Sequence, residues 1–311
     1  MVYRPYVVRV QEISVEVIKR LKEGISGEKI AEMLGVSRTS IWKFVRRLED
    51  FGYIVERRRG VGYRIVKSPD LSPYEVALIC KDIDLINEVY YYTVTDSTNQ
   101  RAKDVAKPKV LFIAERQTKG RGRYGRTWMS KVGGLYFSIT LPQELPIEDV
   151  PKLTLTTGVA IANALNGTLK WPNDVLYKGR KLCGILCELL GEVENPLIVV
   201  GIGINVNNPT PEEGISLKEI YGKEVSRVDV LRKVLKSFKY YYYRLLSGGW
   251  IEIREEWKAL SETLGKNVIV RTVNRTYKGL AVDLDEDGGL IIKSGQNLVK
   301  VFSGDCFYQK I

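Results

Sequence analysis

The chain has 311 residues, with 48 Lys or Arg against 37 Asp or Glu, a formal net charge of +11, and no His. The lack of His excludes Ser–His and Cys–His nucleophile pairs and most catalytic zinc sites, and the four scattered Cys exclude a disulfide scaffold. No apolar run approaches the roughly 20 residues of a membrane span, and the first residues lack a signal-peptide pattern, so we expect a cytoplasmic protein of two or three domains.

The first 67 residues carry 15 Lys or Arg and only 8 Asp or Glu, so much of the positive charge lies at one end of the chain. Apolar spacing predicts three short helices there, around 15–21, over 27–34 and within 37–48. Two β-rich runs around R-R-R-G-V-G then predict a hairpin with a basic tip. This order predicts a winged helix-turn-helix domain over residues 1–67.

The third predicted helix has an apolar stripe on one face and basic residues on the other. A small helical domain with merely solvated charges is the alternative, but the turn, the basic helix face and the wing occurring together favour DNA binding. The candidate DNA-binding residues are Arg38, Thr39, Trp42, Lys43, Arg46, Arg57, Arg58 and Arg59.

S-P-D-L-S-P, residues 68–73, is rich in turn formers and is expected to be a linker. Beyond it, over 74–264, β-branched strands alternate with helices, which predicts a mixed-sheet α+β domain. The expected strands are 89–94, 109–115, 135–141, 182–190 and 197–204. The expected helices are 98–106, 151–165 and 227–246.

Five motifs lie near the expected strand ends, where binding sites gather. They are T-D-S-T-N-Q (95–100), E-R-Q-T-K-G-R-G-R-Y-G-R-T-W (115–128), L-K-W-P-N-D-V-L-Y (169–177), G-R-K-L-C-G-I-L-C-E (179–188) and I-V-V-G-I-G-I-N-V-N (198–207). The Gly-Arg loop suits an anion but lacks the P-loop pattern. Gly201 and Gly203 recur with period two and leave one sheet face bare for a ligand or another backbone.

Each motif also has a purely structural interpretation. Ser97, Thr98 and Asn99 are typical helix-capping residues, although the same groups suit a ureido or amide ligand. K-W-P-N-D is a turn sequence, and the Gly-Arg loop alone resembles a disordered RNA-binding tract, although its place between two strands disfavours that. Cys183 and Cys187 are compatible with one strand face, but nothing supplies the other ligands of a zinc site.

The last segment, 265–311, alternates short apolar runs with D-E-D-G-G and S-G-Q-N turns, which predicts a small β-barrel. Before it, Tyr240–Tyr243 are four successive tyrosines on an expected helix, where they cannot share one face. Packing against a neighbouring domain is the simpler interpretation of this run, and a recognition surface is the other.

In this order, S-T-N, G-R-G-R-x-G-R-x-W, K-W-P-N-D, K-x-x-G-I-L and G-I-G-I-N resemble the biotin protein ligases, the biotin-[acetyl-CoA-carboxylase] ligase family. The resemblance covers the whole chain. The N-terminal module resembles that of the bifunctional members, which also repress the biotin operon. The resemblance therefore implies a class II synthetase-like ligase domain in the centre and an SH3-like β-barrel at the C-terminus.

The resemblance also implies roles for single residues. Biotin is expected at Ser97, Thr98, Asn99, Gln117, Gly120, Arg121, Lys181, Gly184, Gly201 and Gly203. ATP and the adenylate are expected at Arg121, Arg123, Trp128, Lys170, Asn173 and Asn205, and Arg123, Lys170 and Lys181 are the expected catalytic residues. Asp174 ranks lower because it suits the turn. Gln309 or Lys310 stands where some members have an ATP-contacting Arg.

The implied reaction has two steps. Biotin and ATP give biotinyl-5′-AMP and pyrophosphate, and a lysine of a biotin carboxyl carrier protein then takes the biotinyl group. Both steps need the two reactants to be aligned and negative charge to be neutralised. Lys and Arg side chains can do this together with Mg²⁺, which is bound through the ATP phosphates and needs no metal site of the protein. Operator DNA and a second copy of the chain are the other expected partners, and no membrane is expected. Two alternatives remain: a transcription factor that senses biotinyl-AMP without ligase activity, and a lipoate-type ligase.

Overall fold

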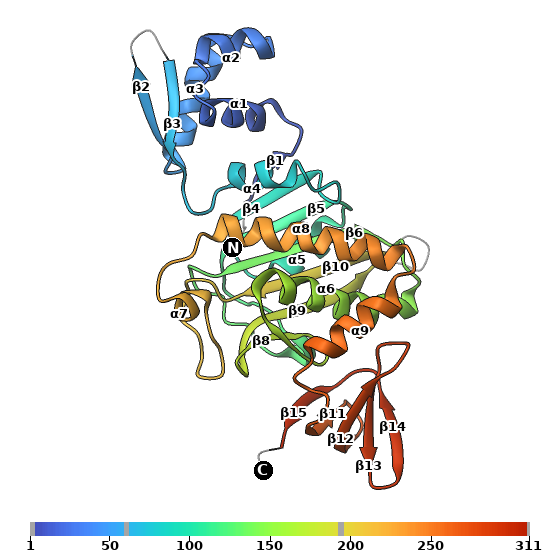
Figure 1. Ribbon diagram of the computed structural model, residues 1–311. Coiled ribbons are helices and arrows are strands. Elements are labelled where there is room, and N and C mark those ends of the chain that lie inside the picture. Colours follow the sequence, from blue (N-terminus) through green and yellow to red (C-terminus); the bar gives the residue numbers. More distant parts are fainter. Residues whose placement is uncertain (1–3, 59–61, 192–195, 310–311) are drawn as a thin grey trace.

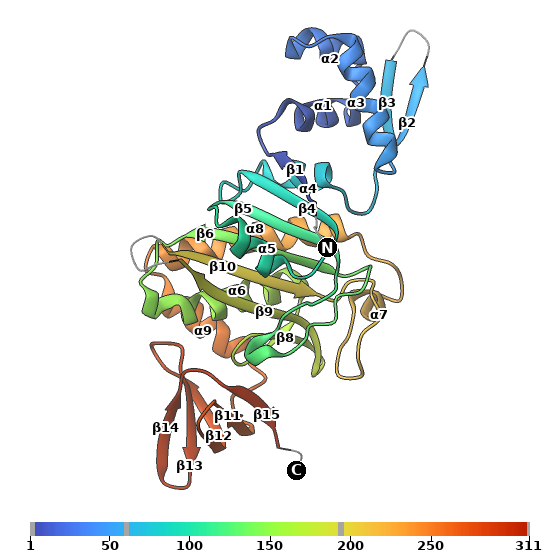
Figure 2. The same ribbon diagram turned by 180° about the vertical axis from the view of Figure 1, so that it is seen from behind.

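The computed structural model describes residues 4–58, 62–191 and 196–309. They form an elongated molecule, with the N-terminal helices at one end and a small unit of β-strands at the other (Figure 1). A broad mixed sheet with helices on both faces lies between the two ends (Figures 1 and 2). In the described ranges no helix is both long enough and apolar enough to span a bilayer. The α+β composition agrees with the prediction.

The N-terminal end contains the predicted helix-turn-helix and wing. Its elements are α1 (Ile13–Lys22), α2 (Gly27–Leu34), α3 (Arg38–Asp50), β2 (Ile54–Arg58) and β3 (Gly62–Lys67). Ser26 and Ser37 begin α2 and α3 by accepting hydrogen bonds from backbone N–H groups of the first turn. Gly35 ends α2 in the left-handed region, at φ 63°, which glycine adopts without steric cost.

The central sheet has eight strands in the order β1-β4-β5-β6-β10-β9-β8-β7. Strands β4 and β5 are parallel, and the other neighbouring pairs are antiparallel. All five predicted strands are confirmed, and they form its middle. The bounds are Tyr6–Arg9 (β1), Glu88–Thr95 (β4), Val110–Gln117 (β5), Leu135–Pro142 (β6), Thr168–Lys170 (β7), Asp174–Tyr177 (β8), Arg180–Leu190 (β9) and Leu197–Ile204 (β10).

The two faces of this sheet are covered unequally. Helices α6 (Val150–Leu165), α8 (Arg227–Leu246) and α9 (Trp250–Leu260) lie over one face, where most of the core is packed (Figure 1). Helix α5 (Thr98–Val105) lies on the other face, over a smaller apolar cluster (Figure 2). The short helix α7 (Leu217–Tyr221) follows β10. Because one short helix covers little of its face, the adjoining ends of β5, β9 and β10 remain available for a binding site.

The expected linker is packed rather than loose. Leu71 and Ser72 are buried, and Ser72 begins α4 (Pro73–Cys80) and hydrogen-bonds the Tyr53 hydroxyl of the N-terminal module at 2.8 Å. Asp70 forms an ion pair with Arg227 at the start of α8. Strand β1 lies within the expected range 1–67 but pairs with β4 of the central sheet. The N-terminal module is therefore joined to the centre on both sides.

The C-terminal unit is an antiparallel five-stranded sheet in the order β14-β13-β12-β11-β15. Its strands are β11 (Asn267–Arg271), β12 (Thr276–Leu284), β13 (Leu290–Ser294), β14 (Asn297–Val301) and β15 (Asp305–Tyr308). The hairpin rhythm predicted for this segment is confirmed.

The four successive tyrosines of α8 do not share one face of the helix, as helical geometry requires. Tyr241 and Tyr242 are buried, whereas Tyr240 and Tyr243 face outward. The middle two residues are therefore packed, but Tyr241 contacts Asn163 of α6 and Glu256 of α9 in the same central domain rather than a neighbouring domain.

Candidate active site and DNA-binding surface

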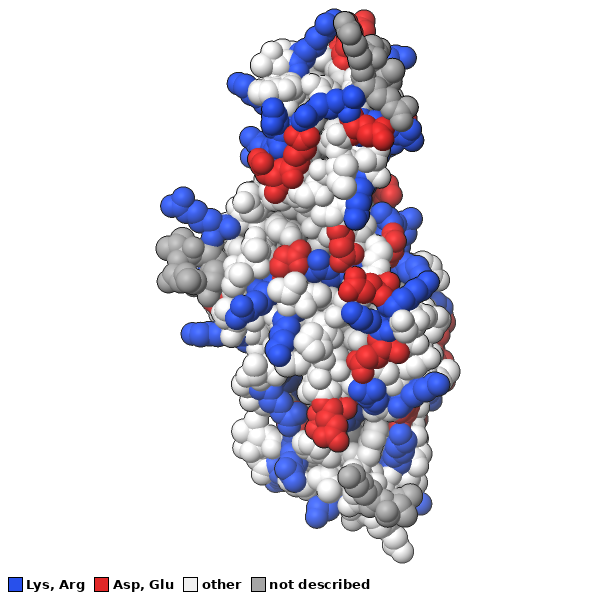
Figure 3. Space-filling model, turned by 90° about the vertical axis from the view of Figure 1, so that its left-hand side faces the viewer, with Lys and Arg blue, Asp and Glu red and all other residues white. Residues whose placement is uncertain are grey.

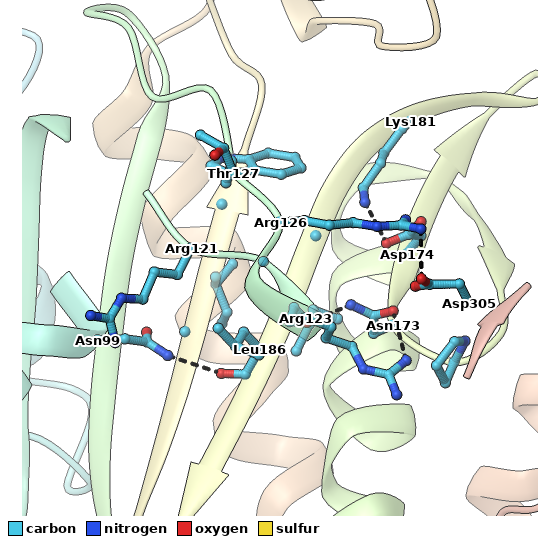
Figure 4. A pocket seen from close by; sticks show the side chains of 18 of the residues that line it. Asn99, Arg121, Arg123, Arg126, Thr127, Asn173, Asp174, Lys181, Leu186 and Asp305 are labelled. Atoms are coloured by element: carbon cyan, nitrogen blue, oxygen red, sulfur yellow. Dashed lines mark hydrogen bonds and ion pairs between the residues drawn. The ribbon is translucent and has the colours of Figure 1, made fainter. Parts of the chain in front are cut away.

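A cavity on the α5 face collects most of the predicted site residues (Figure 4). Its walls come from the start of α5, the ends of β5, β9 and β10, the glycine-rich loop 118–128, the K-W-P-N-D turn and the start of β15. The predicted residues that line it are Ser97, Thr98, Asn99, Gln117, Arg121, Arg123, Trp128, Lys170, Asn173, Lys181, Gly184, Gly201 and Gly203. Five motifs far apart in the sequence therefore form one site.

A hydrogen-bonded cluster of uncharged polar groups forms one end of the cavity. Gln117 Oε1 accepts from the Thr98 backbone N–H at 2.7 Å, while Gln117 Nε2 donates to Ser130 Oγ at 2.8 Å. The buried Ser138 hydroxyl lies 2.7 Å from Thr98 Oγ1 and 2.6 Å from Asn99 Oδ1. Ser97 occupies the N-cap position of α5, yet no side-chain capping bond is present there within the described chain. The cluster thus holds its donors and acceptors toward the cavity rather than only capping the helix.

The two glycines of β10 leave room for side chains that a larger residue would displace. A Cβ at Gly201 would lie 2.0 Å from Asn99 Oδ1, and a Cβ at Gly203 would lie 2.4 Å from Trp128 Nε1. The Trp128 ring also covers Gly184 of β9, where a Cβ would lie 3.0 Å from the indole. The predicted bare sheet face is confirmed, and it lies against the cavity.

Lysine side chains line the other end of the cavity, while the Arg121 side chain extends toward Asn99 (Figure 4). Lys181 Nζ lies 2.7 Å from Asp174 Oδ1 and 5.2 Å from the centroid of the Trp128 ring. Lys170 Nζ lies 4.9 Å from the centroid of the Tyr308 ring. The Trp128 indole N–H is buried, and no acceptor among the described residues bonds to it. A ligand with a neutral polar head and an anionic end matches this arrangement.

The glycine-rich loop is ordered and docks on the C-terminal unit. The backbone N–H of Trp128 donates to the Gly120 carbonyl at 2.9 Å, and the backbone N–H of Gly122 donates to the Arg126 carbonyl at 2.7 Å, so the loop closes on itself. Arg123 Nη1 donates to the Gly304 carbonyl at 3.3 Å and lies 3.5 Å from Asn173 Oδ1. This geometry disfavours the interpretation as a disordered RNA-binding tract.

Two predicted residues lie behind the cavity instead of lining it. Gly120 is buried, and a Cβ there would lie 2.4 Å from the Trp128 carbonyl, so its role here is to let the loop close. Asn205 is also buried, and its amide donates to the Lys181 carbonyl at 3.2 Å. Asn205 therefore supports the backbone that carries Lys181.

Sequence reasoning missed several lining residues: Gly122, Arg126, Thr127, Trp171, Pro172, Ile185, Leu186, Ile202, Gly304, Asp305, Cys306 and Phe307, while Asp174 had been ranked low. The third arginine of the loop was the available signal for Arg126. For residues 304–307 no local pattern existed, because β15 reaches the site only through the fold.

No set of three or more His, Cys, Asp or Glu side chains that could hold a metal occurs in the described ranges. Burial raises the pKa of Cys306 to about 11 and that of Cys187 to about 12, so both thiols are protonated at neutral pH. A protonated thiol is a poor nucleophile, and of these two cysteines only Cys306 lines the cavity.

The predicted DNA surface is exposed on the N-terminal module. Arg38, Thr39, Trp42, Lys43 and Arg46 all face solvent on α3, and the Arg46 guanidinium lies 5.3 Å from the centroid of the Trp42 ring. Basic and acidic side chains are interspersed over the face shown in Figure 3. The prediction of a DNA-binding surface therefore depends on the position of these residues on α3 rather than on local charge.

Acidic partners hold two of the predicted arginines. Arg38 pairs with Glu28, and Arg57 Nη2 lies 2.6 Å from Glu49 Oε1, which braces the wing against α3. Arg58 is the last residue of β2, and Arg59 lies outside the described residues. The open part of the surface therefore consists of Thr39, Trp42, Lys43 and Arg46.

Three family descriptions match successive parts of the chain. Residues 11–64 match the HTH domain, residues 91–205 the Biotin/lipoate A/B protein ligase family, and residues 263–308 the Biotin protein ligase C terminal domain. These ranges agree with the three units seen in the fold.

Individual relatives extend these matches over nearly the whole chain. The bifunctional ligase/repressor BirA of Bacillus subtilis (strain 168) is 35% identical over 303 residues, which covers 91% of this chain and 93% of the relative. BirA of Escherichia coli (strain K12) is 30% identical over 296 residues, covering 90% and 91%. Biotin protein ligase from Aquifex aeolicus, solved with biotin and ATP, superposes with a TM-score of 0.65 at 34% identity, over 72% of this chain and 99% of that one. The chain therefore belongs to the biotin protein ligase family, among the members that join a ligase to an N-terminal DNA-binding repressor module.

Proposed function

We propose that the cavity binds biotin and ATP side by side and forms biotinyl-5′-AMP between its neutral and cationic ends. This proposal rests on the different chemistry of the two ends of the cavity. One end suits a ureido ring because it holds the hydrogen-bonded cluster of Thr98, Gln117, Ser138 and Asn99, whereas Lys181 at the other end suits a carboxylate. The apolar part of biotin then lies between the two ends, beside the Trp128 ring that covers Gly184 and Gly203.

In the first step the biotin carboxylate attacks the α-phosphate of ATP, and pyrophosphate leaves. Lys181, Arg121 and Arg123 neutralise the negative charge that gathers where carboxylate and phosphate meet. The buried indole N–H of Trp128 is available to donate to the adenylate. Lys170 and Asn173 lie on the K-W-P-N-D turn, beside the part of the cavity that we assign to the nucleotide. Asn205 hydrogen-bonds the Lys181 carbonyl and so supports the backbone position from which Lys181 reaches the carboxylate.

Mg²⁺ fits this site through the phosphates of ATP, since Asn173 and Asp174 are the side-chain oxygen donors of the turn beside them. Bound there, the ion supplies charge neutralisation of the polyphosphate. The chain's own contribution is to hold the two substrates in line and to keep water away from the mixed anhydride.

In the second step a lysine amine of a biotin carboxyl carrier protein attacks the acyl carbon, and AMP leaves. The glycine-rich loop covers the adenylate and reopens for the acceptor. Incubation with ATP, labelled biotin and a carrier domain tests this directly, and label on the acceptor lysine is expected. An intact adenylate without label on the carrier would instead indicate a biotinyl-AMP sensor, and preferential transfer of lipoate would indicate a lipoate-type ligase.

We also propose that the exposed face of α3 and the wing bind operator DNA, with two copies of the chain on one palindromic site in the cytoplasm. A dimer that forms through the central sheet when the adenylate is bound would bring the two modules together. In a mobility-shift titration, Lys43→Ala should lower the log–log salt slope by about 0.9 per module if Lys43 contacts one phosphate. Sedimentation with and without biotinyl-AMP measures the dimer, and an unchanged mass would contradict it.

A further inference from the structure

Glu188 of β9 bridges two residues of α5 at one end of the cavity without lining the cavity itself. Its Oε1 lies 2.7 Å from Lys103 Nζ, and its Oε2 accepts from Asn99 Nδ2 at 2.8 Å. Asn99 and Lys103 are four residues apart and so lie on one face of the helix. About a quarter of the side chain is exposed for both Glu188 and Lys103, so the ion pair is shielded on most sides.

These contacts fix the orientation of the Asn99 side-chain amide, that is, the positions of its oxygen and its nitrogen. Both N–H groups of Asn99 are committed, one to the Glu188 carboxylate and one to the Leu186 carbonyl at 3.3 Å, the bond marked in Figure 4. Asn99 Oδ1 accepts one hydrogen bond, from Ser138 Oγ at 2.6 Å, and has a second lone pair. The flipped amide would place its oxygen against the Glu188 carboxylate and the Leu186 carbonyl, where like partial charges repel.

The oxygen of Asn99 is thereby held against the bare face of β10. A Cβ at Gly201 would lie 2.0 Å from Asn99 Oδ1, so only glycine leaves this oxygen in place. Asn99 therefore presents a hydrogen-bond acceptor to the cavity rather than a donor. The complementary ligand group is an N–H, and the ureido ring of biotin has two.

We propose that Glu188, held by Lys103, is a positioning residue that orients Asn99 so that Asn99 Oδ1 accepts a ureido N–H of biotin. This inference rests on the proposed biotin site. Glu188 does not touch the ligand, so its influence on biotin must pass through the Asn99 amide.

An isosteric substitution separates orientation from packing. In Glu188→Gln, Lys103 keeps the oxygen of the new amide, which turns the –NH₂ group toward Asn99 and favours the flipped Asn99. We expect the dissociation constant for biotin, measured by titration calorimetry on the full-length chain, to rise about tenfold, near the upper end of the effect of losing one neutral hydrogen bond. The KM for ATP, kcat at saturating biotin and the midpoint of thermal unfolding should not change. Lys103→Met keeps the carboxylate acceptor but removes the group that holds it, so it should raise the dissociation constant for biotin by less than Glu188→Gln does.

A double-mutant cycle with Asn99→Ala completes the test. Glu188→Gln should have no effect on biotin affinity once Asn99 is absent. Wild-type biotin affinity of Glu188→Gln, or an equal loss with and without Asn99, would overturn the role of Glu188. If instead Asn99→Ala itself binds biotin as tightly as wild type, the proposed role of Asn99 in the biotin site fails.

Discussion

Arg126 of the glycine-rich loop forms an ion pair with Asp305 of strand β15, with Nη2 2.5 Å from Oδ2, although 179 positions separate the two residues in the sequence. The Arg126 guanidinium also lies 5.6 Å from the centroid of the Phe307 ring. Together with the bond from Arg123 to the Gly304 carbonyl, this contact ties the loop to the C-terminal unit. The C-terminal unit is therefore part of the wall of the active site.

Asp305→Ala should loosen the loop without unfolding the protein. Arg126 is more than half exposed, so the pair adds little to global stability, but its loss frees one side of the loop. We expect faster tryptic cleavage between Arg121 and Arg126 and a raised KM for ATP. Glu224→Ala, which removes the exposed pair with Lys218, is the matched control and should leave the cleavage rate unchanged.

Arg123→Gly should release biotinyl-AMP and lose selectivity for the acceptor lysine. Arg123 lies between the loop and Asn173 and is proposed to hold the adenylate, so without it the mixed anhydride should escape into solution. Labelling of unrelated proteins added to the reaction measures the release. Lys119→Ala, an exposed change at the start of the same loop, serves as the control. Retention of the adenylate as tight as in wild type would exclude this role for Arg123.

Lys181→Ala should weaken biotin binding by at least about tenfold, because it removes the cation assigned to the carboxylate and leaves Asp174 without its partner. Equilibrium binding of biotin in the absence of ATP measures the effect. The neighbouring variant Arg180→Ala removes only an exposed pair with Glu219 and should bind biotin normally. Unchanged affinity of Lys181→Ala would place the carboxylate elsewhere.

Arg227→Met should lower the free energy of unfolding by about 3 kcal/mol, the usual cost of removing one partner of a buried ion pair. The Arg227 side chain is 9% exposed and joins Asp70 of the linker to Glu115 of β5, and the Tyr91 hydroxyl donates to Glu115 as well. Urea denaturation measures the loss. Arg232→Ala on the same helix is the control, because it breaks only the exposed ion pair with Asp229. If Arg232→Ala lowered the free energy of unfolding as much as Arg227→Met does, burial of the ion pair would not be the cause of the loss.

Sequence patterns predicted the central strands because β-branched runs and period-two glycines are local signals. The helix-turn-helix was equally readable from the apolar spacing of its helices, and the structure adds the caps at Ser26, Ser37 and Gly35. The cavity residues followed from the family resemblance that the five motifs carry together; four of the motifs include the end of a strand, and the motif 179–188 begins β9.

What the sequence could not predict depends on contacts between distant segments. Asp305 and Phe307 reach the site only because the C-terminal unit docks on the loop. Asn205 directly follows β10 and was expected in the site, but only the fold reveals that its side chain points toward the Lys181 backbone. The four-residue strand β1 is too short and too exposed to stand out as a pattern.

Strand β1 has a consequence for any attempt to separate the two activities. It supplies the outermost strand of the central sheet before the chain enters α1. A fragment that begins at residue 68 would therefore uncover the hydrogen-bonding edge of β4, and such an edge invites pairing with other chains. Excision of the DNA-binding module alone, with β1 spliced back onto the ligase, is the design that keeps this edge closed.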